Sequence, residues 1–566
     1  MSKITRREFM KIGAGVGGLI AAPWSITSAR AASALAGSQL KPFVSALPVP
    51  GNGLVAATPS GLNSYSFTMR QIARQLHPDL PATPLWAYDD GSGLAGQSGL
   101  FGMVVNARTG TPVNASFTNA LPAFYPPWIP VDTRFPPLGL SVRTLTHLHG
   151  GFVAAASDGN PGVQPLGFGA GGAQNVVYPN QAPQQRATML WFHDHYMGNT
   201  RLNVFAGLAG TYFIRDAIDT GTAANVNNLP AAPYEVPIVI QDRLFNTDGT
   251  MRYPVSTIPG VNWIGEYFGD TMLVNGKVWP FFNAEPRVYR FRILNACSAR
   301  ILTLTMDAVP LWQIGNECGL FDVPVPMKEL VLAPAERADV LVDFRTFAGK
   351  TVNVKNQRIH APFSNPANLL PTVMKVNVGT RVTSQQGNAI PAALAGGLLA
   401  NLPAGTTRRF ITLNEVGIDT AGWILTLNGE PFDANGGPTI PVNATEDWTY
   451  INLTGDTHPI HVHLVNFQIV GRTPFDAAAY AAAAPPAPFG SQPIDPAPFV
   501  LGPMQPAYPE ERGFKDTLKA NPNELTTIRM KFELPAGVKG LQSYVQHCHI
   551  LEHEDNDMMN AFHVQA

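Results

Sequence analysis

The sequence predicts an all-β protein made of several β-sandwiches, and three observations support this fold class. Glycine and proline are abundant, at 52 and 51 of 566 residues, which disfavours long helices and is typical of short strands joined by turns. Short apolar or alternating segments recur along the whole chain. The length corresponds to about three or four domains of roughly 100–200 residues each.

The predicted strands are separated by Pro, Gly, Asn and Asp residues, at a spacing typical of β-sandwiches. They are Tyr65–Arg70, Thr188–Phe192, Leu208–Arg215, Tyr234–Asp242, Val288–Leu294, Ile301–Met306, Val340–Phe344, Trp448–Leu453, Phe467–Arg472 and Thr526–Phe532. Two low-complexity segments interrupt this pattern. Gln385–Thr407 is expected to connect two domains, and the Ala/Pro-rich Phe475–Pro509 is expected to form a long surface loop.

The charge pattern excludes several functional classes. Charged residues make up 14% of the chain and the formal net charge is −2, and no segment carries a basic run. Nucleic acid and anionic lipid are therefore excluded as main partners. No apolar run reaches the ~18 residues that cross a bilayer, so no membrane span is expected.

The N-terminal residues 1–31 predict an export signal. Arg6 and Arg7 precede a short apolar, glycine-rich run, Ile12–Ala22, and a small-residue cleavage site at Ala29–Ala31. The paired arginines resemble a twin-arginine signal, which implies the twin-arginine export machinery as a partner and a periplasmic or secreted, oxidising location. The alternative, a basic amphipathic helix, fits poorly with so many glycines.

Histidine pairs are the strongest functional signal in the sequence. Thirteen histidines placed at random in 566 residues would give less than one His-x-His pair, yet the chain contains four. In a strand, residues i and i+2 project from the same face, so each pair directs two imidazoles at one point. Neutral imidazole is the commonest metal ligand, and packing alone does not account for eight such histidines. The pairs are His147/His149, His193/His195, His461/His463 and His547/His549.

A cysteine inside the last pair indicates which metal is bound. Cys548, with His458, His553 and Met558, makes the thiolate, two-imidazole and weak thioether set of a blue-copper electron-transfer site. Zinc is the competing metal, but it prefers four firm ligands in a closed tetrahedron. Copper is therefore predicted.

The remaining eight histidines suffice for three more copper ions, which gives four in total. Because His547 and His549 flank Cys548 on one strand, the thiolate copper would be joined covalently to the other three. One copper that accepts single electrons beside a group that stores them suits the four-electron reduction of dioxygen to water.

The two other cysteines, Cys297 and Cys318, lie on either side of two predicted strands. A hairpin that turns near Asp307 would place them face to face, which predicts a disulfide. The alternative is two buried free thiols.

Four segments resemble the copper signatures of the multicopper oxidases. They are THLHGG (Thr146–Gly151), LWFHDH (Leu190–His195), THPIHVH (Thr457–His463) and HCHILEHEDNDMM (His547–Met559). The resemblance covers nearly the whole chain after the export signal and is strongest to the branch of bacterial spore-coat laccases, bilirubin oxidases and phenoxazinone synthase.

The resemblance implies three cupredoxin-like, Greek-key β-sandwich domains at residues 40–220, 221–384 and 408–566, with a linker at 385–407 and no copper in the middle domain. It also implies the place of each ligand. Type 2 copper would bind His147 and His461, and type 1 copper would bind His458, Cys548, His553 and Met558. The type 3 pair would bind His149, His193, His195, His463, His547 and His549.

Two carboxylates match acids that the family places near the trinuclear copper cluster, namely Asp158 and Glu554. Reduction of O2 in a site that excludes bulk water needs protons, and these acids are candidates to deliver them. Alternatively they only orient the histidine ligands.

The leading hypothesis is a monomeric, laccase-like oxidase that takes single electrons from phenols, aromatic amines or tetrapyrroles and passes them to O2. A second is a periplasmic oxidase of Cu(I) or Mn(II), although the 15 methionines are scattered rather than gathered in an insertion. A third is a non-catalytic cupredoxin scaffold or a copper-sequestering protein, which fits poorly with a complete ligand set.

Overall fold

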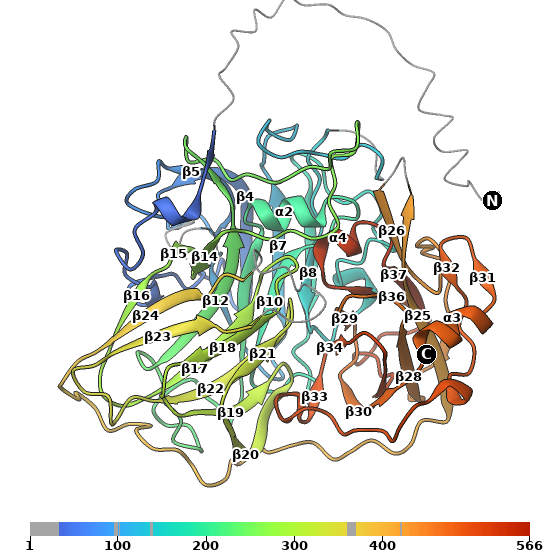
Figure 1. Cartoon of the computed structure of the whole chain (residues 1–566). Coiled ribbons are helices and arrows are strands. Elements are labelled where there is room, and N and C mark those ends of the chain that lie inside the picture. Colours follow the sequence, from blue (N-terminus) through green and yellow to red (C-terminus); the bar gives the residue numbers. More distant parts are fainter. Residues whose placement is uncertain (1–32, 95–99, 101, 136–139, 359–368, 419–421) are drawn as a thin grey trace, which may run out of the picture. The chain divides into compact units, whose positions relative to one another are not determined.

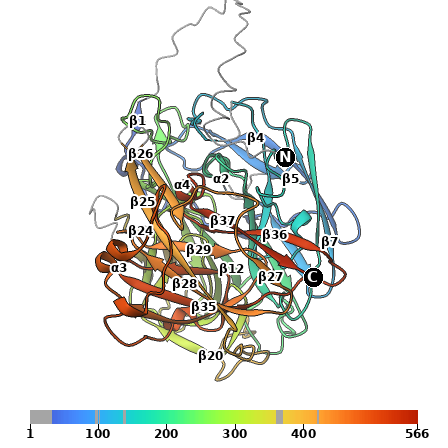
Figure 2. The ribbon, with the colours of Figure 1, turned by 90° about the vertical axis from the view of Figure 1, so that its right-hand side faces the viewer.

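In the computed structural model, the described residues (33–94, 100, 102–135, 140–358, 369–418 and 422–566) form six β-sheets of four or more strands. The six sheets follow one another along the sequence as three pairs (Figures 1 and 2). Ala34–Ala566 is one compact unit. The predicted all-β fold is confirmed, and each strand predicted from the sequence overlaps an observed one.

The first pair consists of two four-stranded sheets. One contains, in spatial order, β6 (Val104–Arg108), β11 (Ala209–Arg215), β10 (Thr188–Asp194) and β8 (Thr146–His149). The other contains β5 (Thr83–Asp89), β4 (Ser64–Arg74), β7 (Val113–Asn119) and β9 (Ala173–Tyr178).

The second pair has a seven-stranded and a five-stranded sheet. The larger contains β15 (Lys277–Val278), β14 (Thr271–Val274), β12 (Glu235–Arg243), β17 (Val288–Asn295), β22 (Arg337–Asp343), β19 (Leu311–Asn316) and β20 (Gly319–Met327). The smaller contains β16 (Phe281–Ala284), β24 (Thr372–Val378), β23 (Thr351–Asn356), β18 (Leu302–Met306) and β21 (Leu330–Leu332).

The third pair, orange to red in Figure 1, has six and five strands. The six-stranded sheet contains β26 (Gly422–Leu427), β25 (Thr407–Ile418), β28 (Thr445–Asn452), β35 (Glu524–Lys531), β30 (Phe467–Pro474) and β33 (Phe514–Lys515). The five-stranded sheet contains β27 (Thr439–Pro441), β37 (Met559–Gln565), β36 (Leu541–Cys548), β29 (His458–Val462) and β34 (Thr517–Ala520).

Short elements complete the described chain. Three two-stranded ribbons pair β1 (Ala34–Leu35) with β13 (Phe245–Asn246), β2 (Val49–Pro50) with β3 (Gly53–Leu54), and β31 (Pro486–Ala487) with β32 (Gly490–Ser491). The α-helices are α2 (Thr200–Ala206), α3 (Ala477–Ala483) and α4 (Leu551–Glu554), and the 3₁₀ turns are η1 (Gly37–Gln39), η2 (Ala155–Ser157), η4 (Ala497–Phe499) and η5 (Pro509–Glu511).

Strands at the junctions between sheet pairs are buried along their whole length, whereas outer strands alternate. β4 shows the alternating burial of a half-covered strand, while β10, β12, β17 and β22 are buried at every position. The reason is that β10 and β11 pack against the second pair. Met189, Trp191 and Phe213 share one apolar cluster with Val239 and Leu294. A strand covered on both faces reads as a continuous apolar run. β10 carries the candidate ligand His193, and His195 follows its last residue.

The predicted disulfide is wrong, because Cys297 and Cys318 are free. The prediction assumed that the strands between them form a hairpin. Instead β18 pairs with β21 and β23 in the five-stranded sheet, and β19 lies in the seven-stranded sheet. The chain crosses from one sheet to the other, so the two thiols are not brought face to face, and burial raises the pKa of each.

The predicted surface loop Phe475–Pro509 is partly structured. Its alanine-rich start forms α3, where the Asp476 carboxylate accepts a hydrogen bond from the Ala479 amide at 2.9 Å. Alanine is the best helix former, and the aspartate caps the helix. Tyr480 anchors α3 in an apolar cluster with Ile451 and Leu525. The helix-favouring composition therefore outweighs the low complexity of the segment.

Three further predictions concern a linker, the domain boundaries and an export signal. Residues 379–406, between β24 and β25, contain no regular element, and they include all of the predicted linker 385–407 except Thr407, which begins β25. The predicted domain boundaries stay predictions, and the predicted export signal at residues 1–31 lies outside the described residues. No helix among the described residues is long and apolar enough to span a membrane.

Candidate metal centre

Two pairs of neighbouring strands carry the four His-x-His motifs. β8 and β10 pair antiparallel with His147 opposite His193. β29 and β36 pair in the same way, with His461 opposite His547 and Ile460 opposite Cys548. Alternation places His149 on the same side of β8 as His147, while His195, His463 and His549 each lie one residue beyond the end of their strand. All eight imidazoles are buried.

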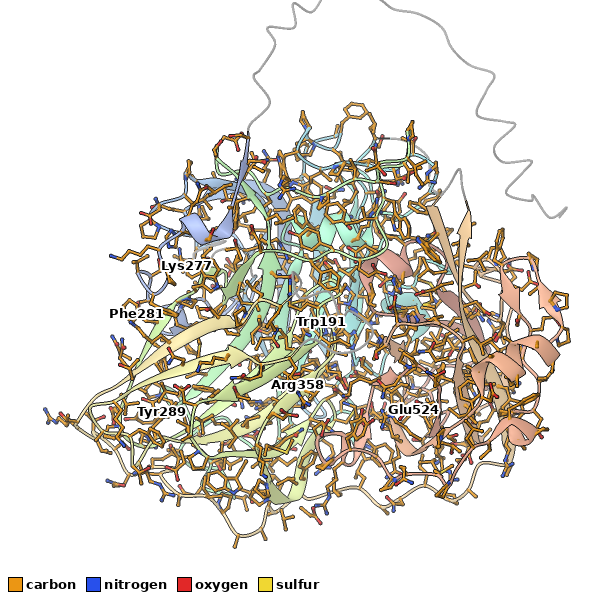
Figure 3. The ribbon with its side chains drawn as sticks, viewed as in Figure 1. Trp191, Lys277, Phe281, Tyr289, Arg358 and Glu524 are labelled. Carbon is orange, nitrogen blue, oxygen red and sulfur yellow. The ribbon has the colours of Figure 1, made fainter. Side chains whose placement is uncertain are left out.

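The N-terminal and C-terminal histidines meet at one place. The ring of His149 lies 3.6 Å, between centroids, from that of His461, and the ring of His147 lies 4.0 Å from that of His463. Trp191, labelled in Figure 3, covers one side, with its ring centroid 4.2 Å from that of His193. Motifs separated by about half of the chain therefore form one cluster.

Within the cluster, ligand atoms converge in groups of three. The Nε2 atom of His463 lies 3.2 Å from Nε2 of His195 and 3.3 Å from Nε2 of His547. Two further groups, each with ligand atoms within 4.8 Å of one another, are His149/His193/His549 and His147/His149/His461. Three nitrogens around one point is the arrangement that a metal ion requires.

Unpartnered nitrogens show that the cluster fits metal ions. Nε2 of His147, His193 and His461, Nδ1 of His149 and both ring nitrogens of His549 are buried without a hydrogen-bond partner among the described residues. Buried polar atoms are nearly always paired, because an unpaired one loses its hydration without compensation. So many unpaired and converging nitrogens fit a bound group that accepts electron pairs, as a metal ion does.

The protonation of these histidines also suits metal binding. Burial, together with the charges of neighbouring imidazoles, lowers the pKa of His147, His149, His193, His461 and His463 well below its ordinary value. It lowers the pKa of His549 to about 3. At neutral pH these imidazoles are therefore neutral, which is the form that binds a metal.

The two candidate acids contact the cluster directly. Oδ2 of Asp158 lies 2.7 Å from Nδ1 of His463, and its main-chain carbonyl accepts a hydrogen bond from Nδ1 of His147 at 2.5 Å. Glu554, in α4, lies 3.0 Å from Nδ1 of His195 and 3.3 Å from Nδ1 of His547. Burial raises the pKa of Asp158 to about 8. Burial also opposes ionisation of Glu554, but His195 and His547 outweigh it and hold its pKa well below the ordinary value.

A second group of ligand atoms surrounds Cys548. Its Sγ lies 3.5 Å from Nδ1 of His458 and 3.7 Å from Nδ1 of His553, and the two imidazole nitrogens are 3.3 Å apart. Met558 is buried, and its main-chain carbonyl accepts a hydrogen bond from the Cys548 amide at 2.9 Å. One thiol, two imidazoles and a neighbouring thioether match the donor chemistry of a blue-copper site.

Two carboxylates that the sequence analysis missed border this second group. Oε1 of Glu266 lies 3.3 Å from Nε2 of His553, and Oε1 of Glu415 lies 3.6 Å from Nε2 of His458. Their side chains are 30% and 15% exposed, whereas both histidines are buried. Neither glutamate belongs to a motif, so only the fold brings them to this edge.

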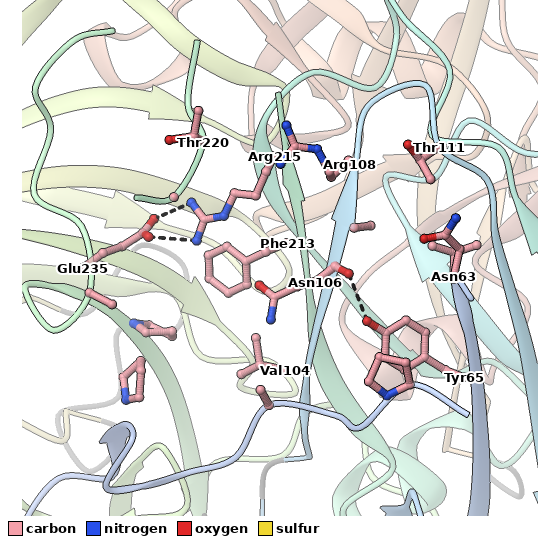
Figure 4. A pocket seen from close by; sticks show the side chains of 18 of the residues that line it. Asn63, Tyr65, Val104, Asn106, Arg108, Thr111, Phe213, Arg215, Thr220 and Glu235 are labelled. Atoms are coloured by element: carbon pink, nitrogen blue, oxygen red, sulfur yellow. Dashed lines mark hydrogen bonds and ion pairs between the residues drawn. The ribbon is translucent and has the colours of Figure 1, made fainter. Parts of the chain in front are cut away.

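A separate cavity of about 710 Å³ lies between β3, β6, β11 and β12 (Figure 4). Leu54, Val104 and Phe213 contribute apolar surface, and a bidentate ion pair between Arg215 and Glu235, at 2.9 and 2.8 Å, borders it. None of its described lining residues is a histidine or a cysteine. It is therefore not a candidate for the metal centre.

Comparison with known proteins agrees with this geometry. Two family models described as multicopper oxidase match residues 139–218 and 405–566, which together contain all the candidate ligands. A laccase from Bacillus subtilis (strain 168) is 34% identical over 540 residues, covering 92% of this chain and 98% of that protein. A laccase from Haloferax volcanii is 32% identical, covering 100% of this chain and 92% of that protein.

A solved structure supports the same relationship. The McoA multicopper oxidase of Aquifex aeolicus superimposes with a TM-score of 0.71 at 25% identity, covering 93% of this chain and all of that chain. The fold class expected from the sequence, three cupredoxin-like β-sandwiches, is thereby confirmed. The chain belongs to the multicopper oxidase family and is a copper-dependent oxidoreductase that uses O2 as its electron acceptor.

Proposed function

We propose that this protein is a laccase-like oxidase. It oxidises phenols, aromatic amines or tetrapyrroles by one electron at a time and reduces O2 to water. The observation that carries the proposal is the position of Cys548, the last residue of β36, between His547 and His549. The Cys548 thiol lies with the second ligand group, and the imidazoles of His547 and His549 lie in the histidine cluster. The backbone between these adjacent residues therefore provides a covalent path from one metal site to the other.

The proposed ligand assignment uses four copper ions. The type 1 ion takes His458, Cys548, His553 and Met558, and the type 2 ion takes His147 and His461. The type 3 pair takes two groups of three, His149/His193/His549 and His195/His463/His547. Convergence of the ligand atoms, their burial and the unpartnered nitrogens support this assignment.

When bound, copper supplies one-electron transfer at the Cys548 group and the reduction of O2 at the histidine cluster. Four one-electron oxidations of the reductant provide the four electrons that, with four protons, convert one O2 into two water molecules. The buried imidazoles exclude bulk water from the cluster, so protons must arrive through side chains. Asp158 and Glu554 each touch two cluster histidines and are the groups proposed to deliver these protons. Asp158 acts as a protonated donor, and Glu554, which His195 and His547 hold ionised, acts as an acceptor that relays them.

The second candidate function, oxidation of a metal cation such as Cu(I) or Mn(II), is favoured by one observation. The carboxyl groups of Glu266 and Glu415 lie beside the buried imidazoles of His553 and His458, and the side chains of the two glutamates are themselves 30% and 15% exposed. Carboxylates in this position attract cations more strongly than neutral phenols. The third candidate, a non-catalytic or copper-sequestering protein, is disfavoured because the complete donor set is retained.

We also propose that the protein is exported by the twin-arginine machinery, acts in the periplasm or outside the cell, and is a monomer. Arg6, Arg7 and the apolar run after them support export. Export of an already folded chain would suit a cluster whose ligands come from both ends of the sequence.

Replacing Cys548 tests the proposed type 1 site. In copper-loaded Cys548→Ser, the intense blue absorption of a copper–thiolate bond is expected to disappear, and the copper content to fall by one ion, because a hydroxyl does not replace the thiolate. Absorption spectroscopy and metal analysis measure both. Cys297→Ser, a buried cysteine outside both ligand groups, is the matched control and should keep the colour. A blue Cys548→Ser protein would refute the assignment.

Replacing the acids tests proton delivery. Asp158→Asn and Glu554→Gln are expected to lower kcat by about 10²- to 10⁴-fold, the usual effect of losing a general acid or a general base. Anaerobic bleaching of the blue colour by reductant should stay unchanged, and only its return on adding O2 should slow. Stopped-flow absorption follows both steps. Asp447→Asn, in a partly buried ion pair with Arg529 away from the histidine cluster, is the control. If the blue colour returns on adding O2 as fast in both variants as in the unmodified protein, Asp158 and Glu554 only orient the histidine ligands.

Oxygen uptake with a panel of reductants separates the first two functions. We expect a methoxyphenol, an aromatic amine or bilirubin to be oxidised with higher kcat/KM than Cu(I) or Mn(II). In the double variant Glu266→Gln/Glu415→Gln, KM should rise for the cations and stay constant for the neutral phenol, because only cations lose an attraction. Glu430→Gln, at an exposed position, is the control. Higher kcat/KM for a metal ion than for every aromatic reductant would favour the metallo-oxidase.

A further inference from the structure

Asp516 contacts two histidines of the cluster, one from each half of the chain. It lies between β33 and β34 and is fully buried. Its main-chain carbonyl accepts a hydrogen bond from Nδ1 of His461 at 2.7 Å. Its Oδ1 accepts a hydrogen bond from Nε2 of His149 at 3.1 Å. One residue therefore holds an imidazole of β8 and an imidazole of β29.

The same contact pattern occurs at Asp158 on the other side of the cluster. There the main-chain carbonyl binds Nδ1 of His147 and the carboxylate lies against Nδ1 of His463. In both cases the carbonyl holds a proposed type 2 ligand and the carboxylate holds a proposed type 3 ligand from the other half of the chain. Asp516 is thus the counterpart of Asp158.

The two carboxylates differ in what neutralises them. Both oxygens of Asp516 are bound by the guanidinium of Arg337, at 2.8 and 2.6 Å, in a buried bidentate pair of the strong kind. Oδ1 of Asp158 has no hydrogen-bond partner among the described residues. The guanidinium of Arg337 therefore fixes both oxygens of the Asp516 carboxylate, whereas one oxygen of Asp158 has no such partner. The first suits positioning and the second suits proton transfer.

Arg337 comes from the part of the chain that supplies no candidate ligand. It begins β22 of the seven-stranded sheet, and its Nε donates a hydrogen bond to the carbonyl of Met189 on β10 at 3.2 Å. The strand β10 carries His193, and His195 follows its last residue. Arg337 therefore links the second sheet pair to β10 and to Asp516. Asp516 in turn contacts one histidine in each of two other His-x-His motifs.

The glycine after His149 is explained by this ion pair. Gly150 has a φ of +82°, and a Cβ atom there would lie 2.4 Å from Oδ2 of Asp516 and 3.0 Å from Nη2 of Arg337. A side chain at this position would therefore collide with the pair, besides straining the backbone. The first glycine of the THLHGG segment leaves the space that the carboxylate and the guanidinium occupy.

We propose that Asp516 and Arg337 are positioning residues for the trinuclear copper cluster. Because Oδ1 of Asp516 accepts from Nε2 of His149, that nitrogen carries the proton, and the unpartnered Nδ1 is left for copper. The carbonyl of Asp516 likewise leaves Nε2 of His461 free. Groups that orient histidine ligands in this way fix the tautomer and the ring angle. The inference rests on the proposed assignment of His149 and His461 as ligands.

The test compares Asp516→Asn, Arg337→Lys and the double variant after copper loading. The affinity of the cluster for copper is expected to fall by about 10- to 100-fold, as for other groups that orient ligands. The electron paramagnetic resonance signal of the type 2 ion should change, and the blue absorption at Cys548 should remain. The double variant should lose little more than the worse single variant, because the pair acts as a unit.

The buried pair between Arg472 and Glu511 is the matched control. It is also bidentate, at 2.6 and 2.8 Å, and neither residue makes a hydrogen bond or an ion pair to a cluster histidine among the described contacts. Glu511→Gln should lower thermal stability and keep the type 2 signal. Arg337→Lys keeps the charge and provides the test if Asp516→Asn does not fold.

Two outcomes separate this inference from the proposed function. Full copper content and an unchanged type 2 signal in blue variants of Asp516 and Arg337 would overturn the positioning role alone. Absence of blue absorption and of a copper cluster in the unmodified protein would overturn the proposed function, and the inference with it.

Discussion

The structure depends on one constraint, which is that eight buried imidazoles from both ends of the chain must be satisfied at a single place. Their unpartnered nitrogens cannot be left in a dry interior without a compensating ligand. Metal ions meet this need, because neutral imidazoles donate electron pairs to them. The sandwiches that carry β8, β10, β29 and β36 must therefore meet at this point, and the position of these strands follows from the cluster as much as from apolar packing.

Asp158 and Asp516, on opposite sides of the histidine cluster, have different proposed roles. Asp158 and Asp516 make equivalent contacts on opposite sides, yet only Asp516 is neutralised by an arginine. Ion pairs in the interior contribute little net stability, because desolvation offsets their attraction. Their value here lies in geometry. The Arg337 guanidinium fixes a carboxylate, the carboxylate fixes an imidazole, and the sheet pair without ligands thereby participates in the centre.

The sequence was sufficient for the parts that follow from local patterns. The alternation of β4, the continuous apolar run of β10 and the His-x-His spacing depend only on neighbouring residues, so the strands and the ligands were predictable. The carboxylates Glu266, Glu415 and Asp516 were not, since each reaches its histidine through long-range packing and belongs to no motif. The sequence around Asp516 offered one weak indication of a special role, because this acid lies between Lys515 and Lys519 in a chain with few charged residues. The disulfide between Cys297 and Cys318 was mispredicted because strand order cannot be read from spacing when the chain changes sheets.

The most direct test of the central claim is anomalous X-ray scattering at the copper absorption edge from crystals of the copper-loaded protein. The account predicts four peaks, three of them enclosed by the eight histidines of the four His-x-His motifs, and one between Cys548, His458 and His553. Peaks elsewhere, or an empty space between His149, His193 and His463, would contradict it.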